Sequence, residues 1–303
     1  MNGEALSHFN TIAVVVVAMS FVVGGGVVFA ASIFPAWRRV AAEFRRLYVQ
    51  EFIIVGAILV PAALGKWVFL LLLLAIEYRS LLELFDAFGL DKAIPIRWSA
   101  TVVGGGLIIL GLLVPAILFP ALLVSVAALL IISATIERGH VSSATVVAIV
   151  SLFFPSVLVA LTAMLRSGHN GLGWIILVYA TVEMNDAFAL LVGKLVGNRP
   201  FLPRLSPHKT FEGLVGGIVV GGITGYAASR YLLELTPLSA VVVAVCTLAA
   251  GATGDLAVSA VKRLRHRKDF RPVLAAHGGV LDIYDSFLFA APLALLVRTV
   301  AGF

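Results

Sequence analysis

Acidic side chains stand where charge is costly, inside or at the edge of long apolar segments. Glu183 and Asp186 share one such segment and Asp255 lies in another, while Asp282 and Asp285 stand at the start of a third. The remaining acidic residues are assigned to loops. An ionisable residue inside a membrane-spanning helix costs on the order of 3 kcal/mol on insertion scales, so each of these carboxylates is a functional candidate. Such a set near one aqueous face predicts a site for a hard divalent cation such as Mg²⁺.

Basic residues follow the central acid of this set. Ser259, Lys262 and Arg263 lie four, seven and eight residues after Asp255 and therefore continue its helical stripe. Carboxylates, Mg²⁺ and cations together suit phosphoryl or nucleotidyl transfer, because the cations bind phosphate oxygens. Two alternatives stay open: Asp255 pairs with Lys262 or Arg263 only to ease its burial, or Glu183 is simply a buried, hydrogen-bonded or protonated carboxyl group.

The segment 198–213 is predicted to be a rigid loop, because its three prolines exclude a regular helix. Ser206, Lys209 and Thr210 supply two hydroxyl groups and a cation there, a combination that suits the phosphates of a nucleotide. The pattern GxxxxGK[ST] is absent, so this is not a Walker A loop. The alternative is an ordinary connector whose charges only set membrane topology.

The composition indicates what must position these residues. Of the 303 residues, 61% are hydrophobic and 13% are charged, whereas a soluble domain is about half apolar and about a quarter charged. This excludes a soluble globular enzyme and a disordered chain, and the single cysteine excludes an intrachain disulfide. We expect an all-α, polytopic integral membrane protein with no soluble domain. A spanning helix needs roughly 20 apolar residues, and about ten segments qualify: 10–34, 52–65, 67–83, 99–118, 119–137, 144–165, 173–196, 213–234, 238–261 and 284–301.

The distribution of basic residues predicts the orientation. Residues 1–10 contain no Lys or Arg, so the first segment is interpreted as a retained span with its N-terminus outside. This topology places the segments 194–212 and 262–282 together on the cytoplasmic side of the inner membrane, as the positive-inside rule favours. Of the 22 Lys and Arg residues it leaves outside only Lys66, Arg166, Arg230 and Arg298.

Small residues at a spacing of four indicate close helix packing in lipid. Gly213, Gly217, Gly221 and Gly225 form such a series. The runs Gly24–Gly26 and Gly104–Gly106 are interpreted in the same way.

Two stretches resemble the motifs of the phosphatidate cytidylyltransferases, also called CDP-diacylglycerol synthases. The similarity is specific from about residue 174 to 290, and the N-terminal half matches only as a set of hydrophobic helices. The first stretch carries Ser259, Lys262-Arg263, Lys268-Asp269, His277-Gly278-Gly279, Asp282 and Asp285. The second carries Asn185-Asp186, Gly193-Lys194, Gly197, Pro203, Ser206-Pro207, Lys209-Thr210 and Glu212-Gly213, followed by Gly254-Asp255-Leu256.

The resemblance implies an all-helical, often homodimeric membrane enzyme that acts on membrane lipids and not on nucleic acid. Its reaction joins CTP to phosphatidate and yields CDP-diacylglycerol and pyrophosphate, with Mg²⁺ and a monovalent cation such as K⁺. Carried over by position, the metal-site carboxylates are Asp255, Asp282 and Asp285. The phosphate and nucleotide contacts, and the residues that complete their cavity, are Lys262, Arg263, Asn185, Asp186, Ser206, Lys209, Thr210, Ser259, Lys268, His277, Gly278 and Gly279. The chain then divides into 1–50 (the first span and a basic loop), 51–172 (a helical membrane region) and 173–303 (the catalytic region).

The chain departs from the family pattern beside the last two aspartates. Ile283 stands where the family has Arg, Arg271 where it has a small residue, and Val258 where Glu is common. We expect Arg271 to supply the missing phosphate contact, and an Arg at position 283 to restore part of it. A catalytically impaired homologue that binds lipid or regulates a partner is the first alternative, and a transporter is the second.

Overall fold

The computed structural model describes residues 33, 38–89, 94–113, 143–202, 206–264, 269–273 and 278–303. In this part of the chain helices dominate, as predicted, and no soluble domain is present. The predicted spans 10–34 and 119–137 lie outside it, apart from residue 33. The helices are α2 (Arg38–Leu64), α3 (Lys66–Ala87), α4 (Ile94–Leu113), α6 (Ser143–Ser167), α7 (Gly171–Val196), α8 (Phe211–Leu232), α9 (Pro237–Leu264) and α10 (Val280–Ala301).

Four of the described helices, α7 to α10, are long and apolar enough to cross a membrane. Val49–Leu64 and Pro155–Ser167 are shorter apolar helical stretches. These findings support a membrane protein but not the predicted count of about ten spans. The helices also extend beyond the apolar segments, since α2 begins at Arg38 rather than near residue 52. Hydropathy marks the part of a helix that suits a bilayer, whereas polar residues continue the same helix outside it.

The break between α2 and α3 falls at Gly65. Its φ of 136° and ψ of 165° are accessible to glycine and strained for other residues. Pro61 lies inside α2 and does not end it. One long apolar stretch therefore becomes two helices because glycine allows the turn.

The glycine series of α8 lies against α7, as predicted. A Cβ atom at Gly217 would come within 2.6 Å of the Asn185 carbonyl oxygen, and one at Gly221 within 3.0 Å of the Thr181 carbonyl oxygen. Side chains at these positions would push the two helices apart, so the series brings their backbones together. Among the second set, Gly104 packs against Glu77 of α3, whereas no atom of another described element lies within 4 Å of a Cβ atom placed at Gly105 or Gly106, so their packing role stays a prediction.

Helix α10 is the central helix of the described fold. It contacts α3, α6, α7 and α9. In its most apolar stretch of 18 residues, 61% of the residues are buried, compared with 22% in the corresponding stretch of α8. Phe287 of α10 packs edge-on against Tyr179 of α7, with ring centroids 5.4 Å apart. Any group at the start of α10 is therefore held by helices from both halves of the chain.

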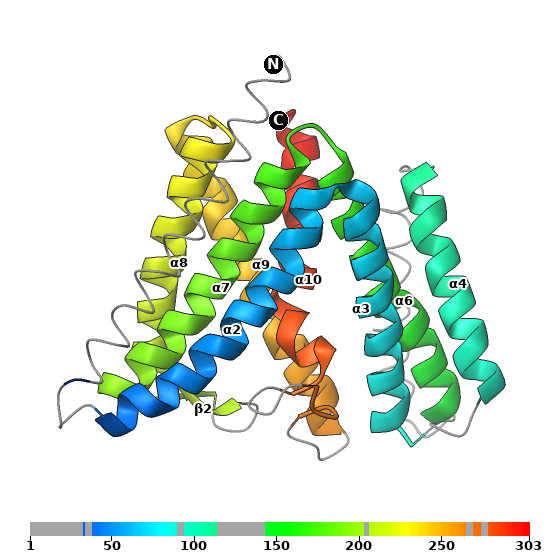
Figure 1. Cartoon of the computed structure of the whole chain (residues 1–303), viewed down its shortest axis with the longest axis horizontal. Helices are drawn as coiled ribbons and strands as arrows, with labels where there is room; N and C mark the ends of the chain where they lie inside the picture. The colour runs from blue at the N-terminus through cyan, green and yellow to red at the C-terminus, as the bar shows by residue number, and fades with distance from the viewer. Residues whose placement is uncertain are drawn as a thin grey trace.

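The segment between α7 and α8 is an antiparallel hairpin of β1 (Pro200–Leu202) and β2 (Ser206–Thr210). The predicted absence of a helix here is confirmed. The hairpin, the end of α9 and the start of α2 lie at one end of the molecule, opposite the C-terminus (Figure 1). The two basic segments thus share one end, while the side of the membrane that they face stays a prediction.

Candidate functional site

An ion pair joins the hairpin to the middle of α9. Lys209 of β2 donates to an Asp255 carboxylate oxygen, and the two side chains are 42% and 22% exposed. Burial lowers the pKa of the Lys209 ammonium group, but Asp255 and two further carboxylates outweigh it, so its pKa lies above the ordinary value. Lys209 therefore stands protonated at the entrance of an acidic cluster.

A second ion pair lies deeper, between the end of α9 and the start of α10. Lys262 Nζ is 2.7 Å from Asp282 Oδ1, and both side chains are about one-tenth exposed. Asp282 Oδ2 accepts hydrogen bonds from the backbone N–H groups of Phe270, at 2.8 Å, and Gly279, at 2.9 Å. Asp282 thus fixes the loop and the helix start around itself, as an acidic residue in the first turn of a helix often does. The alternative that Asp255 pairs with Lys262 is wrong, since the ion-pair partners are Lys209 for Asp255 and Asp282 for Lys262. The pairing of Asp255 with Arg263 stays a prediction.

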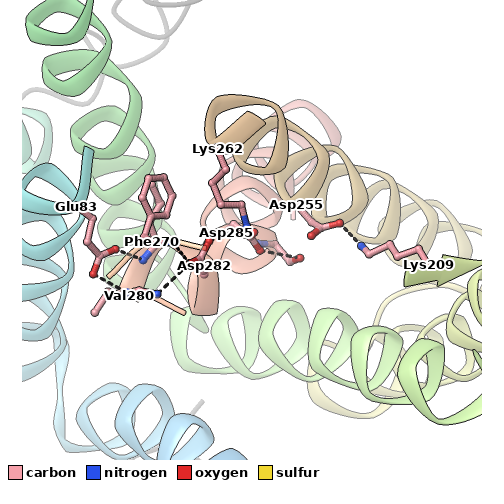
Figure 2. A network of polar contacts seen from close by, with 11 residues as sticks. Glu83, Lys209, Asp255, Lys262, Phe270, Val280, Asp282 and Asp285 are labelled. Atoms are coloured by element: carbon pink, nitrogen blue, oxygen red, sulfur yellow. Dashed lines mark hydrogen bonds and ion pairs between the residues drawn. The ribbon is translucent and has the colours of Figure 1, made fainter. Parts of the chain in front are cut away.

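Asp285 is the most enclosed acid of the cluster. It is 6% exposed and accepts hydrogen bonds from the backbone and hydroxyl group of Ser286. Its charged neighbours include Asp255 of α9, Asp186 of α7 and Lys262. Figure 2 shows Asp285 beside Asp282 and Lys262, with Asp255 and Lys209 to one side. Carboxylates from three helices that are distant in sequence therefore converge, as the sequence predicts.

Asp186 forms the open side of the cluster. It is exposed, and it accepts a hydrogen bond of 2.9 Å from the side-chain amide of Asn185. The two residues thus lie together, as their motif predicts. Glu183, one turn earlier, instead has a side-chain hydrogen bond with Glu51 of α2, which favours the interpretation of a buried, hydrogen-bonded carboxyl group.

The donor set of the cluster suits a hard divalent cation. Four carboxylates, of Asp186, Asp255, Asp282 and Asp285, face two ammonium groups, of Lys209 and Lys262. When all six groups are ionised, the four carboxylates and the two ammonium groups carry a net charge of −2, which one Mg²⁺ ion balances. Within the described ranges, however, no three His, Cys, Asp or Glu side chains are arranged to hold one ion. Asp282 is held by Lys262 and two backbone amides, and Asp255 by Lys209, so binding of one ion by Asp186, Asp255 and Asp285 requires these side chains to rearrange.

The remaining predicted residues divide by position. Thr210 is the N-cap of α8, and its hydroxyl oxygen accepts a hydrogen bond of 3.1 Å from Gly213 N. Ser259 is buried on the α9 stripe beside Lys262, and Arg263 follows it in the last turn. Ser206 begins β2, and nothing is described of its side chain, while Lys268 and His277 lie outside the described residues.

Gly278 and Gly279 leave room for carboxylates, and this explains the paired glycines. A Cβ atom at Gly278 would meet the Asp282 carboxylate, and one at Gly279 would meet the carboxylate of Glu83 on α3. The Gly278 carbonyl oxygen also accepts a hydrogen bond of 3.1 Å from Val273 N. The glycine turn therefore shapes the start of α10.

The assignment of the other acidic residues to loops is wrong for several residues of the described helices: Glu43 and Glu51 of α2, Glu77, Glu83 and Asp86 of α3, and Glu212 of α8. Two of them are deeply buried. Glu77 and Glu83 are each 2% exposed inside the helix. Glu77 accepts a hydrogen bond of 2.9 Å from Ser156 of α6, and Glu83 binds the start of α10. Their position inside the predicted span 67–83 indicates that both carboxylates are buried. Their partners cannot be inferred from the sequence, because they lie far away along the chain.

The departures from the family pattern also have a structural setting. Ile283 is half-buried and packs against the apolar core. Arg271 is exposed and directly follows Phe270, whose backbone binds Asp282. The structure thus leaves a cation near the site on the loop, where the prediction for Arg271 requires it.

This helical membrane architecture, with carboxylates and cations at one end, agrees with the sequence comparisons. Residues 44–301 match the model of the Cytidylyltransferase family, and the chain belongs to that family. It is 35% identical over 137 residues to a phosphatidate cytidylyltransferase of Mycobacterium bovis (strain ATCC BAA-935 / AF2122/97), a stretch that covers 45% of each chain.

Other relatives give the same picture. The chain is 38% identical over 125 residues to a phosphatidate cytidylyltransferase of Bacillus subtilis (strain 168), covering 40% of this chain and 46% of the relative. It is also 37% identical over 118 residues to the uncharacterized protein YnbB of Escherichia coli (strain K12), covering 39% and 40%. The chain thus matches about half the length of these curated relatives. The resemblance inferred from the motifs is confirmed.

Proposed function

We propose that this protein is a membrane-bound phosphatidate cytidylyltransferase, which joins CTP to phosphatidate and releases pyrophosphate. The observation that carries the proposal is the meeting of Asp186, Asp255 and Asp285 with Lys209 and Lys262 in a member of the cytidylyltransferase family. A nucleoside triphosphate and its metal ion require cations for the phosphates and carboxylates for the metal.

The reaction exchanges one phosphoanhydride bond for another. A phosphate oxygen of the lipid attacks the α-phosphorus of CTP, a new P–O bond forms, and the bond between the α- and β-phosphates breaks. Pyrophosphate carries away the bonding electron pair. A lipid monoester phosphate is already largely ionised near neutral pH, so the site needs no dedicated general base.

The residues of the chain bind and orient the reactants. Lys209, at the exposed edge, is placed to contact the triphosphate, and Lys262, deeper in the site, to contact the lipid phosphate. Asp186, Asp255 and Asp285 would hold Mg²⁺, which would supply positive charge against the charge that develops on the phosphates. We further propose a cytoplasmic orientation for this end, a requirement for a monovalent cation such as K⁺, and a homodimer.

The test uses the purified full chain in lipid nanodiscs with CTP, Mg²⁺ and a panel of lipid phosphates. We expect pyrophosphate release that depends on lipid, together with a product whose mass is that of a CDP-lipid. ATP in place of CTP and omission of lipid are the controls. Lipid binding without pyrophosphate release would contradict the proposal and favour the impaired homologue, and flux across vesicles without CTP consumption would favour the transporter.

A further inference from the structure

Glu83 of α3 is a buried carboxylate that binds the start of α10. It is 2% exposed, and its two oxygens accept hydrogen bonds from the backbone N–H groups of Val280, at 2.8 Å, and Leu281, at 2.9 Å. The first N–H groups of a helix have no partner within the helix and attract negative charge. Glu83 thus completes the N-terminus of a helix that begins 197 residues later in the chain.

Two carboxylates accept the hydrogen bonds of the first backbone N–H groups of α10. Asp282 binds Gly279 N from within the helix, and Glu83 binds the next two amides from outside it. Leaving a buried backbone donor without a partner is costly, so losing Glu83 would free this turn to shift. Figure 2 shows Glu83 and Asp282 on either side of the turn at Val280.

Gly279 makes the contact with Glu83 sterically tight. A Cβ atom at Gly279 would lie 2.8 Å or less from both carboxylate oxygens of Glu83. The φ of Gly279 is −72°, which alanine adopts without strain. A methyl group at position 279 would therefore act on the carboxylate of Glu83 and not on the backbone conformation of the turn.

We propose that Glu83 is a positioning residue for the carboxylates of the active site. It fixes the first turn of α10 against α3, and this turn carries Asp282 and leads directly to Asp285. The inference rests on the proposed function, because that reaction is what the two aspartates serve. Glu83 itself touches neither substrate, so its effect on catalysis passes through the helix.

Glu77 provides a matched control on the same helix. It is also 2% exposed, but its partner is the Ser156 hydroxyl group of α6, at 2.9 Å, and not α10. Glu77→Gln removes a buried carboxylate from α3 without touching the start of α10. Glu83 also lies 3.6 Å from an Arg79 guanidinium nitrogen of its own helix, so an effect that Glu83→Gln shows and Glu77→Gln lacks is assigned to the turn when Gly279→Ala reproduces it.

The experiment measures turnover, the half-saturating Mg²⁺ concentration and hydrogen exchange of the segment 279–284 in the full chain in nanodiscs. We expect Glu83→Gln to lower kcat about tenfold or more, to raise the half-saturating Mg²⁺ several-fold and to speed exchange of the segment. The KM for lipid should change little, and Glu77→Gln should behave as the wild type does. Gly279→Ala should reproduce the losses of Glu83→Gln, and its effect should shrink when combined with Glu83→Ala, which makes room for the methyl group.

Each outcome decides the proposal. Wild-type kcat and Mg²⁺ dependence in Glu83→Gln would overturn it, even if exchange increases, and so would equal losses in Glu77→Gln. If Glu83→Gln does not fold, Gly279→Ala and the double variant decide by the same measurements. An inactive wild type would overturn the proposed function, and unchanged exchange in Glu83→Gln would then overturn the positioning role as well.

Discussion

Lys209 of the hairpin and Asp255 of α9 form an ion pair although 46 residues separate them in sequence. The pair links the hairpin before α8 to the helix after it, and both residues belong to the second motif stretch. Asp255 also neighbours Asp186 and Asp285. Its carboxylate therefore interacts both with Lys209 and with the acidic residues proposed to bind a metal.

Asp255→Asn should abolish turnover while the fold is kept. The neutral amide is a weaker ligand for Mg²⁺ than the carboxylate, and we expect a loss of about a hundredfold or more in kcat, or about 3 kcal/mol of transition-state stabilisation. Pyrophosphate release and the thermal unfolding midpoint would be measured side by side. Near-normal turnover in a folded variant would show that Asp255 is no metal ligand.

Lys209→Met should raise the KM for CTP about tenfold, because it removes a cation from the entrance of the site. The pKa of Lys209 is raised above its ordinary value of 10.5. The stability that its ion pair contributes is therefore fully present below about pH 10.5 and is lost as the pH rises through the higher folded-state value. The difference in unfolding midpoint between wild type and Lys209→Met should stay constant from about pH 7 to 9.5 and narrow above 10.5. A difference that narrows below pH 9 would contradict this assignment.

Lys262 and Asp282 should show strong energetic coupling. Their side chains are only 10% and 9% exposed, and removing one partner of a buried pair costs about 3–5 kcal/mol because the other charge stays unpaired. Lys262→Met and Asp282→Asn should each destabilise the protein, and the double variant should be more stable than the sum of the two effects indicates. Unfolding in detergent would measure this cycle, and additive effects would rule out the pairing.

The sequence predicted most of what belongs to single helices or to local motifs. The carboxylates at Asp255, Asp282 and Asp285 are detectable because charge is rare in apolar segments, and the hairpin because of its three prolines. The glycine series of α8 also follows from spacing alone. These features depend on residues that are close together in the sequence, so the sequence alone is enough to predict them.

Pairing between distant elements was not predictable in the same way. The sequence predicts phosphate contacts for both Lys209 and Lys262 but does not indicate their carboxylate partners, which are Asp255 and Asp282 in the fold. Glu83 was overlooked because its partners lie 197 and 198 residues away. Choosing among many oppositely charged partners requires knowing which helices touch, and hydropathy does not contain this information.

Gly217→Ala should destabilise the protein more than Gly222→Ala does. At Gly217 a new Cβ atom would lie 2.6 Å from the Asn185 carbonyl oxygen, whereas at Gly222 the nearest atom is 3.7 Å away. Overpacking of this kind costs about 1–3 kcal/mol, and we expect it to displace α7 and its Asn185-Asp186 pair as well. The thermal unfolding midpoint and turnover of both variants test this. Equal stability of the two variants would contradict the close approach of α7 and α8.

Arg271→Ala should lower turnover about tenfold, or about 1.4 kcal/mol, if the loop supplies the phosphate contact that the family places at position 283. Arg271 is exposed and directly follows Phe270, whose backbone binds Asp282, so its backbone lies close to the cluster. Ile283 packs against the apolar core. Ile283→Arg, in the Arg271→Ala background, should therefore destabilise the protein instead of restoring activity, contrary to the expectation from the motif alone. Turnover and unfolding of the single and double variants would be compared. Recovery of activity in the double variant would show that position 283 reaches the phosphates, and an unchanged turnover in Arg271→Ala would remove Arg271 from the site.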